Sequence, residues 1–223
     1  MNDFKKNKYC VIRNALSKEM SDFLYHYSVL KKQSVTTMID SKYLNPFEDV
    51  LGTWGDKQVK DTYSHYADFA METLLYKFIP IMEKHTKLKL VPTYSYMRIY
   101  QKGNVLARHK DRNSCEISTT LNLGGDAWPI FVSPNDNVGI ANTFGGKKNI
   151  TMASNARGSA VHLAPGDMLV YRGCELEHWR EEFHGDHCVQ VFLHYNRKGT
   201  KLAKENFMDT RPHLGLPIWF KGK

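Results

Sequence analysis

The sequence predicts a single, mainly β domain with helices packed on one face of the β structure. The chain has 223 residues, which suits one large domain, and no linker or internal repeat divides it. Beyond Leu88, short segments rich in β-branched and aromatic residues alternate with Gly, Asn, Asp and Pro. Strands at this spacing are typical of a sandwich or barrel. The expected strands are "LVPTYSYMRIY", "EISTTLNL", "WPIFV", "NITMAS", "SAVHLA", "DMLVYR" and "HCVQVFLHYN".

Residues 1–87 are expected to form a strand and two supporting helices. "YCVIRNAL" has the composition of a strand, and Ser17 is a suitable N-cap for a helix over "KEMSDFLYHYSVLKK". Residues 34–57 contain Gly, Pro and Asn without a clear period, which predicts a long irregular connection, either the border of a substrate cleft or a plain loop. The apolar face of the first helix comprises Leu16, Met20, Phe23, Leu24 and Tyr27.

A second helix is expected from Tyr66 to Phe78, where apolar residues recur at helical spacing. Pro80 should kink or end it, because proline lacks the backbone N–H that a helix interior requires. Residues 88–198 then form the β core and residues 199–223 a C-terminal extension. The three parts are expected to belong to one domain.

Composition excludes several classes of protein. Apolar residues make up 42% and charged residues 24%, as in an ordinary globular protein. No apolar run approaches the roughly 20 residues of a membrane span, and no signal-peptide pattern opens the chain, so we expect a cytoplasmic protein without a membrane partner. The cysteines lack CxxC spacing, which argues against a zinc ribbon or a disulfide framework. They are Cys10, Cys115, Cys174 and Cys188.

The net charge of +8 and the pI near 9.2 are compatible with an acidic partner. However, the lysines are concentrated towards the two ends of the chain, where charge is usually a solvated surface, and no nucleic-acid motif accompanies them. The sequence therefore argues against nucleic-acid binding. It leaves the oligomeric state open.

A histidine and a carboxylate stand two positions apart in "ARHKDRN", as His109 and Asp111. Residues two apart in an extended chain point to the same side, so both side chains can face one metal ion. Two histidines and one carboxylate form the facial triad of non-haem iron(II) sites, which leaves positions open for other ligands. His178, His184 and His187 are candidates for the second histidine. We favour His178, because it follows a Pro-Gly-Asp turn and an apolar strand.

The order of these features resembles the iron(II)- and 2-oxoglutarate-dependent dioxygenases, most closely their prolyl-4-hydroxylase-like branch. The resemblance covers about Tyr94 to Tyr195: an aromatic strand, a Gly turn, HxD, a strand ending in Leu-Asn, a Gly-Gly segment and a distal histidine. It implies a double-stranded β-helix, or jelly roll, with the N-terminal helices on one face. It also implies the iron ligands His109, Asp111 and His178, and Tyr100 in the cosubstrate pocket. The implied cofactors are iron(II), 2-oxoglutarate and, optionally, ascorbate.

The distal carboxylate of 2-oxoglutarate needs a cation and a hydroxyl donor, because a buried anion without partners is costly. The family usually supplies an arginine or lysine at the position that is His187 or Cys188 in this chain, so the expected base is missing. Three cations remain as alternatives: His187, Arg180 and Arg98. Ser118 and Thr120 share one face of their strand, and the resemblance places Thr120 near the same carboxylate.

The resemblance implies hydroxylation of a substrate C–H bond with release of succinate and carbon dioxide. The branch points to a peptidyl proline or an amino-acid-type substrate, that is, a peptide or a small molecule. The carboxylate of Asp111 favours hydroxylation over halogenation, which would need a small residue there. Two rival interpretations remain: a cupin-like metalloenzyme that does not use 2-oxoglutarate, and a catalytically silent metal-binding module. Residues 34–57 and 136–158 carry no readable code for the substrate.

Overall fold

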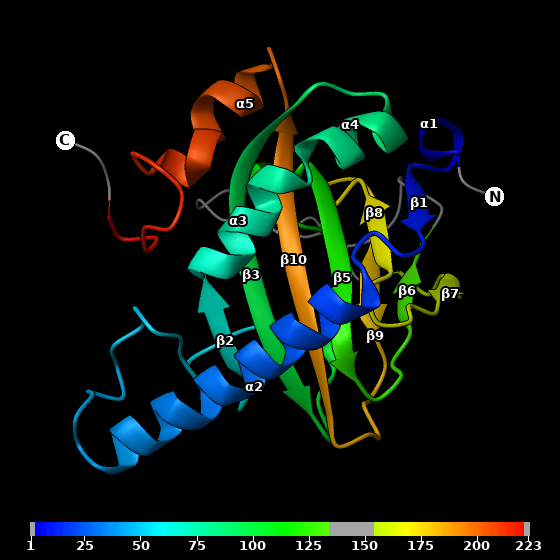
Figure 1. The fold of residues 1–223 in the computed structure, drawn as a ribbon. Helices are drawn as coiled ribbons and strands as arrows, with labels where there is room; N and C mark the ends of the chain where they lie inside the picture. Colours follow the sequence, from blue (N-terminus) through cyan, green and yellow to red (C-terminus); the bar gives the residue numbers. More distant parts are fainter. Residues whose placement is uncertain (1–2, 134–153, 221–223) are drawn as a thin grey trace.

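Two antiparallel sheets form the centre of the computed structural model, which describes residues 3–133 and 154–220 (Figure 1). The larger sheet has six strands in the order β1-β8-β5-β10-β3-β2, and the smaller has four in the order β4-β9-β6-β7. The large-sheet strands are β1 (Tyr9–Ile12), β8 (Met168–Tyr171), β5 (Ile117–Gly125), β10 (His187–Arg197), β3 (Leu90–Gln101) and β2 (Tyr63–Tyr66). The small-sheet strands are β4 (Leu106–His109), β9 (His178–Arg180), β6 (Ile130–Val132) and β7 (Ser159–Val161).

Three helices cover one face of the large sheet (Figure 1). They are α2 (Lys18–Asp40), α3 (Phe69–Lys77) and α4 (Ile79–Thr86). Side chains of β10 such as Val191 and Leu193 pack against Leu24 and Met71 from these helices in the main apolar core. Close packing of α2 on β5 requires a glycine at position 124, because an added Cβ would lie 2.7 Å from the ring of Tyr25. The expected jelly-roll core with helices on one face is confirmed.

The alternation of side chains along β10 separates two environments. Val189, Val191 and Leu193 face the helices, whereas Cys188 belongs to an apolar cluster with Tyr100 and Trp128 on the other face. That inner face meets the small sheet. The interior between the sheets therefore receives side chains from β3, β5 and β10 on one side and from β9 on the other.

The first helix begins where the sequence predicts and ends later. Ser17 caps it, since its Oγ accepts the N–H of Met20 at 3.2 Å. It continues to Asp40, seven residues into the segment expected to be irregular, because residues 34–40 contain no Gly or Pro and Val35 extends the buried stripe. The predicted apolar face was wrong in part. Met20 and Phe23 are 44% and 63% exposed, and the small residues Ser21 and Ser28 are buried beside Leu24 instead.

The break at Pro80 is confirmed, and it separates α3 from α4, with the proline in the first turn of α4. Sequence patterns missed β2, a strand of only four residues whose last residue, Tyr66, was expected to begin the second helix. The predicted strand "NITMAS" lies almost entirely outside the described residues, as does most of the predicted loop 136–158. No helix of the described ranges has the length and low charge that crossing a bilayer requires.

The C-terminal extension contains the short helix α5 (Lys201–Asn206), followed by a 3-10 turn, η2 (Phe207–Thr210). Buried Arg211 fixes this segment to the core, because it pairs with Glu72 of α3 at 3.1 Å and donates to the carbonyl of Thr93. At the other terminus, α1 (Phe4–Asn7) leads into β1. The extension is thus tied to the helices that cover the large sheet.

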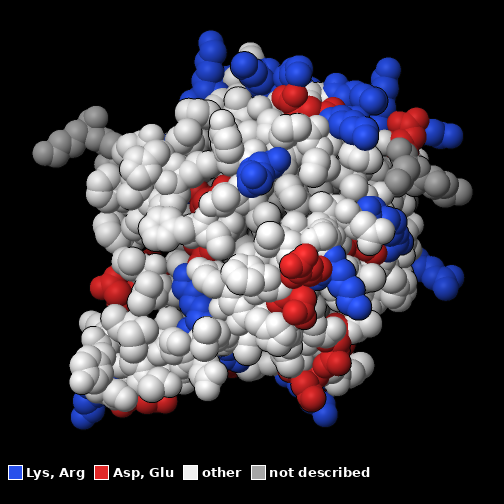
Figure 2. Space-filling view, in the orientation of Figure 1, with Lys and Arg blue, Asp and Glu red and all other residues white. Residues whose placement is uncertain are grey.

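Lys and Arg side chains gather over the end of the molecule that α4 and α5 form (Figure 2). Two of them make ion pairs with nearby glutamates, Lys89 with Glu83 at 2.7 Å and Lys201 with Glu205 at 3.5 Å. Part of the positive charge is therefore neutralised locally. Exposed pairs of this kind contribute little to stability, at most about 1 kcal/mol each.

Candidate metal centre and cosubstrate pocket

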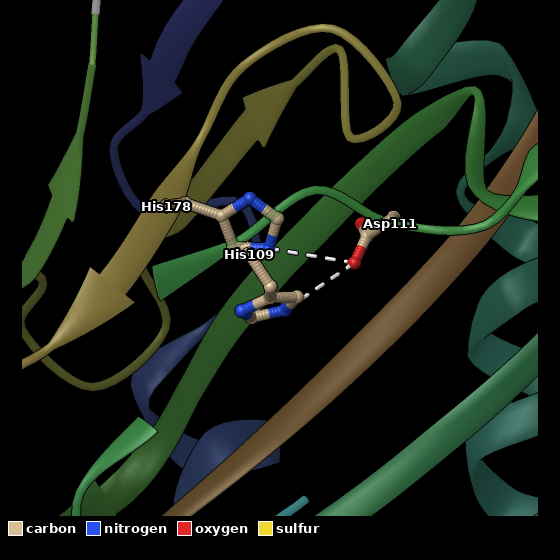
Figure 3. A group of neighbouring side chains, drawn as sticks. All are labelled: His109, Asp111 and His178. Atoms are coloured by element: carbon tan, nitrogen blue, oxygen red, sulfur yellow. Dashed lines mark ion pairs between the residues drawn. The ribbon is translucent and has the colours of Figure 1, made fainter. Parts of the chain in front are cut away.

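The side chains of His109, Asp111 and His178 converge between the two sheets (Figure 3). His109 ends β4 and His178 begins β9, and the two residues are direct partners in the antiparallel pairing of these strands. Asp111 follows two residues after β4, and its N–H donates to the carbonyl of Gly173 at 2.9 Å. Asp111 Oδ1 lies 3.6 Å from Nε2 of His109 and 3.4 Å from Nε2 of His178. One ligand atom from each residue can therefore meet a single ion.

Each histidine is oriented by a carbonyl of its own strand region. Nδ1 of His109 lies 2.7 Å from the carbonyl oxygen of Ala107, and Nδ1 of His178 lies 3.0 Å from that of Leu176. Because a carbonyl can only accept, Nδ1 carries the proton and Nε2 keeps its lone pair in the neutral ring. This arrangement fixes the tautomer that binds a metal through Nε2.

The carboxylate is held in its ionised form. Burial alone would raise the pKa of Asp111, but the two histidines hold it well below its ordinary value. Burial opposes protonation of His178, yet the nearby carboxylate raises its pKa, whereas burial and the neighbouring His178 lower the pKa of His109. Two imidazole nitrogens and one carboxylate on one side of a strand pair match the donor set of a facial triad.

Arg180 lies deeper in the interior, two residues after His178 on the same face of β9. Its side chain is 1% exposed, and it donates from Nη1 to the carbonyl of Trp128 and from Nη2 to Oγ1 of Thr120 at 3.4 Å. Its Nε has no hydrogen-bond partner. Within residues 3–133 and 154–220, no carboxylate forms an ion pair with it. A buried guanidinium with an unused donor is suited to bind an anion.

Arg98, the second candidate cation, already has a carboxylate. Its Nε and Nη2 both donate to Oδ2 of Asp56, the former at 2.9 Å, and its Nη1 donates to the hydroxyl of Tyr100 at 2.9 Å. Gln58 joins this group, because its Oε1 accepts from Arg98 at 3.0 Å and its amide nitrogen lies 2.9 Å from Nε2 of His109. The segment between α2 and β2 thus reaches the metal centre through Gln58 and the guanidinium of Arg98 through Asp56, two residues that the sequence did not single out.

His187 points away from the interior. It lies on the same face of β10 as Val189, and its Nε2 contacts the hydroxyl of Tyr25 on α2. The structure therefore does not bring His187 together with the other candidates for the distal carboxylate. The reason is the two-residue period of the strand, which turns position 187 towards the helices and position 188 inward.

The two hydroxyl candidates on β5 point into the interior at different depths. Thr120 donates to Oε1 of Gln190 at 3.0 Å and lies 3.4 Å from Nη2 of Arg180, so the structure brings these two candidate residues together. Ser118 instead donates to Oδ2 of Asp111 at 2.7 Å, so it belongs to the metal centre. Gln190, the partner of Thr120, could not be singled out from the sequence, because a glutamine inside a strand carries no distinctive signal.

No family model matches the sequence, and no curated protein matches it. Solved structures match over most of the chain. A prolyl-4-hydroxylase from Pseudomonas putida has 14% sequence identity and a TM-score of 0.56, covering 88% of this chain and 96% of that one. The shared architecture is the jelly roll, two antiparallel sheets with helices on one face. HygX from Streptomyces hygroscopicus, with nickel and 2-oxoglutarate bound, has 12% identity and a TM-score of 0.54, covering 88% and 85%.

The oxygenase fold accommodates several reactions. SnoK, a non-haem α-ketoglutarate-dependent carbocyclase from nogalamycin biosynthesis, has 11% identity and a TM-score of 0.57, covering 99% of this chain and 92% of that one. At such identities the likeness extends to the fold. The family resemblance seen in the sequence is thus confirmed at the level of architecture, and the chemistry must be argued from the residues.

Proposed function

We propose that the protein is an iron(II)- and 2-oxoglutarate-dependent oxygenase that hydroxylates a C–H bond of a peptidyl proline or amino-acid-type substrate. The observation that carries this proposal is the convergence of His109, Asp111 and His178 at the interface of the two sheets, with the buried, unpaired cation Arg180 farther inside. A metal site alone would not need that cation. Together they fit a metal-chelating dianion with a remote carboxylate.

The chain supplies binding and orientation. His109, Asp111 and His178 would hold iron(II), and Arg180 with Thr120 would hold the distal carboxylate of 2-oxoglutarate. When bound, iron(II) and 2-oxoglutarate supply the oxidation by dioxygen, with release of succinate and carbon dioxide. The protein's contribution is to fix three ligands, leave the remaining metal positions open and exclude water around the reacting groups.

The type of substrate is proposed from the branch that the sequence resembles. Among the structural neighbours, one prolyl hydroxylase from Trichoplax adhaerens is in complex with a hypoxia-inducible-factor peptide, and HygX has been solved with hygromycin B. The fold therefore serves peptides and small molecules alike. The intact carboxylate of Asp111 supports hydroxylation, because a halogenase needs that coordination position for a halide.

The test begins with anaerobic addition of iron(II) and 2-oxoglutarate to the purified protein. We expect the weak visible charge-transfer band of the iron-bound keto acid, and after admission of oxygen we expect succinate. Asp111→Ala should abolish both, whereas Asp186→Ala, a matched change at an exposed carboxylate, should leave both unchanged. Absence of the band in the unmodified protein would refute the proposal.

The same experiment separates the two rival functions. A cupin-like metalloenzyme would bind metal and consume oxygen without converting 2-oxoglutarate to succinate. A silent binding module would bind iron(II) tightly and turn over no keto acid. Unpaired Arg180 favours the proposed oxygenase over both rivals, since neither requires an anion partner at that depth.

A further inference from the structure

Both carboxylate oxygens of Asp111 have close polar neighbours. Oδ1 faces the two histidines, and Oδ2 accepts a hydrogen bond from Ser118 Oγ at 2.7 Å. The hydroxyl of Ser118 also lies 3.0 Å from the carbonyl of Cys115 and 3.1 Å from Nδ1 of His194. If the proposed function is correct, these contacts determine how the carboxylate is presented to the metal.

The serine hydroxyl has one proton and three neighbours that could take part. The carboxylate of Asp111 and the carbonyl of Cys115 can only accept, whereas Nδ1 of His194 can donate. A donation from His194 satisfies the serine oxygen and directs its proton to the carboxylate, where the charge-assisted bond is the strongest available. If Nδ1 accepted instead, the serine would have to share its proton with the imidazole.

The surroundings of His194 favour donation of its Nδ1 proton to Ser118. It is buried on the inner face of β10, with its ring 4.5 Å from the ring of Tyr94. Burial lowers its pKa to about 4, so the imidazole is neutral and has a single N–H. Its one hydrogen-bond partner among the described residues is Ser118.

Gly173 closes the remaining side of the carboxylate. A Cβ added there would lie 2.3 Å from Oδ2 of Asp111 and 2.4 Å from Oγ of Ser118, so any side chain would displace one of them. The backbone of the same residue accepts the N–H of Asp111. The glycine and the serine together leave the carboxylate a single orientation.

We propose that Ser118 and His194 are positioning residues: a hydrogen-bond chain from His194 through Ser118 fixes Oδ2 of Asp111 and thereby aims Oδ1 at the metal. Ser118 and His194 would not bind the metal themselves; they would act on it by orienting the carboxylate of Asp111. Asp111, Cys115 and His194 form a second group whose ligand atoms lie within 4.8 Å of one another. Burial raises the pKa of Cys115 well above its ordinary value, which opposes the thiolate that such a site needs.

The test uses cobalt(II) as the probe, in anaerobic titrations followed by visible absorption. Ser118→Ala and His194→Leu should each weaken cobalt(II) binding roughly 10- to 100-fold, the usual loss when a group that orients a metal ligand is removed. The double variant should bind no more weakly than Ser118→Ala, because the two residues act in series. His194→Asn should recover much of the affinity, since its amide can donate from near the Nδ1 position.

Ser28→Ala is the matched control, because it removes another buried serine hydroxyl, on α2. It should bind cobalt(II) like the unmodified protein. Equal affinity of Ser118→Ala and the unmodified protein would overturn the inference and leave the proposed function standing, whereas failure of the unmodified protein to bind cobalt(II) would overturn both. An intense near-ultraviolet sulfur-to-cobalt band would reveal Cys115 as a ligand and also refute the positioning role. Thermal unfolding of each variant shows whether it is folded.

Discussion

Substitution of Arg180 by methionine tests the proposed cosubstrate pocket most directly. Methionine has a similar length and fills the buried space, but it has no charge and no N–H groups. In the structure the guanidinium has an unpaired Nε and no carboxylate partner among the described residues. The variant therefore removes the proposed anion-binding group and breaks no ion pair.

The expected magnitude follows from the kind of bond that is lost. A hydrogen bond to a charged group contributes about 1.5–3 kcal/mol. The dissociation constant of 2-oxoglutarate should therefore increase roughly 10- to 150-fold, since 1.4 kcal/mol corresponds to a factor of ten. Without 2-oxoglutarate, Arg180→Met should be at least as stable as the unmodified protein, because burying an unpaired charge costs several kcal/mol.

Calorimetric titration of the cobalt(II)-loaded protein with 2-oxoglutarate measures the first effect, and urea unfolding measures the second. Arg98→Met is the contrasting variant, because it would leave Asp56 buried without its cation and should destabilise the protein by about 3–5 kcal/mol. Unchanged affinity for 2-oxoglutarate in Arg180→Met, with metal binding intact, would refute the assignment of Arg180 to the distal carboxylate.

Three further predictions concern stability and metal binding. Arg211→Met should lower the free energy of urea unfolding by about 3–5 kcal/mol, because it leaves Glu72 buried and unpaired. Burial opposes ionisation of Asp68, but hydrogen bonds from His65 and Lys31 lower its pKa below the ordinary value. The stabilisation by the ionised carboxylate is therefore present above about pH 4 and is lost as the pH falls further. Asp68→Asn should reduce the difference between the urea midpoints measured at about pH 6 and pH 3. Cobalt(II) at 100 times its Kd should raise the free energy of unfolding by about 2.7 kcal/mol, and His178→Ala should abolish the resulting shift in thermal unfolding, as should a chelator in the unmodified protein.

The sequence identified the elements whose signals are local. Ser17 predicts the start of the first helix because its side chain caps the first turn. Pro80 predicts the break after the second helix because it lacks a backbone N–H. The end of the first helix was less predictable. Residues 34–40 have weak helix propensity, and burial of Val35 against the sheet decides their conformation.

The candidate metal ligands were also accessible to sequence reasoning. His109 and Asp111 are close in the chain, and a third ligand on a neighbouring strand follows from the arrangement of short strands. The surrounding groups were not accessible, because they come from distant segments. Gln58 reaches His109 from the segment between α2 and β2, and His194 reaches Ser118 from β10, contacts that only the tertiary structure creates.

The packing around Cys188 explains how β10 can lack the arginine or lysine that was expected at position 187 or 188. Position 188 points inward, towards the proposed site of the distal carboxylate, and a small thiol occupies it. The guanidinium of Arg180 lies over the ring of Trp128, 4.9 Å from its centroid, and Trp128 belongs to the same cluster as Cys188, so Arg180 lies on the side of β10 towards which position 188 points. Trp128 and Thr120 accept hydrogen bonds from Nη1 and Nη2 of Arg180, and its Nε has no partner among the described residues. The small side chain of Cys188 therefore leaves room for Arg180 of β9, which can take the proposed anion-binding role in place of a basic residue on β10.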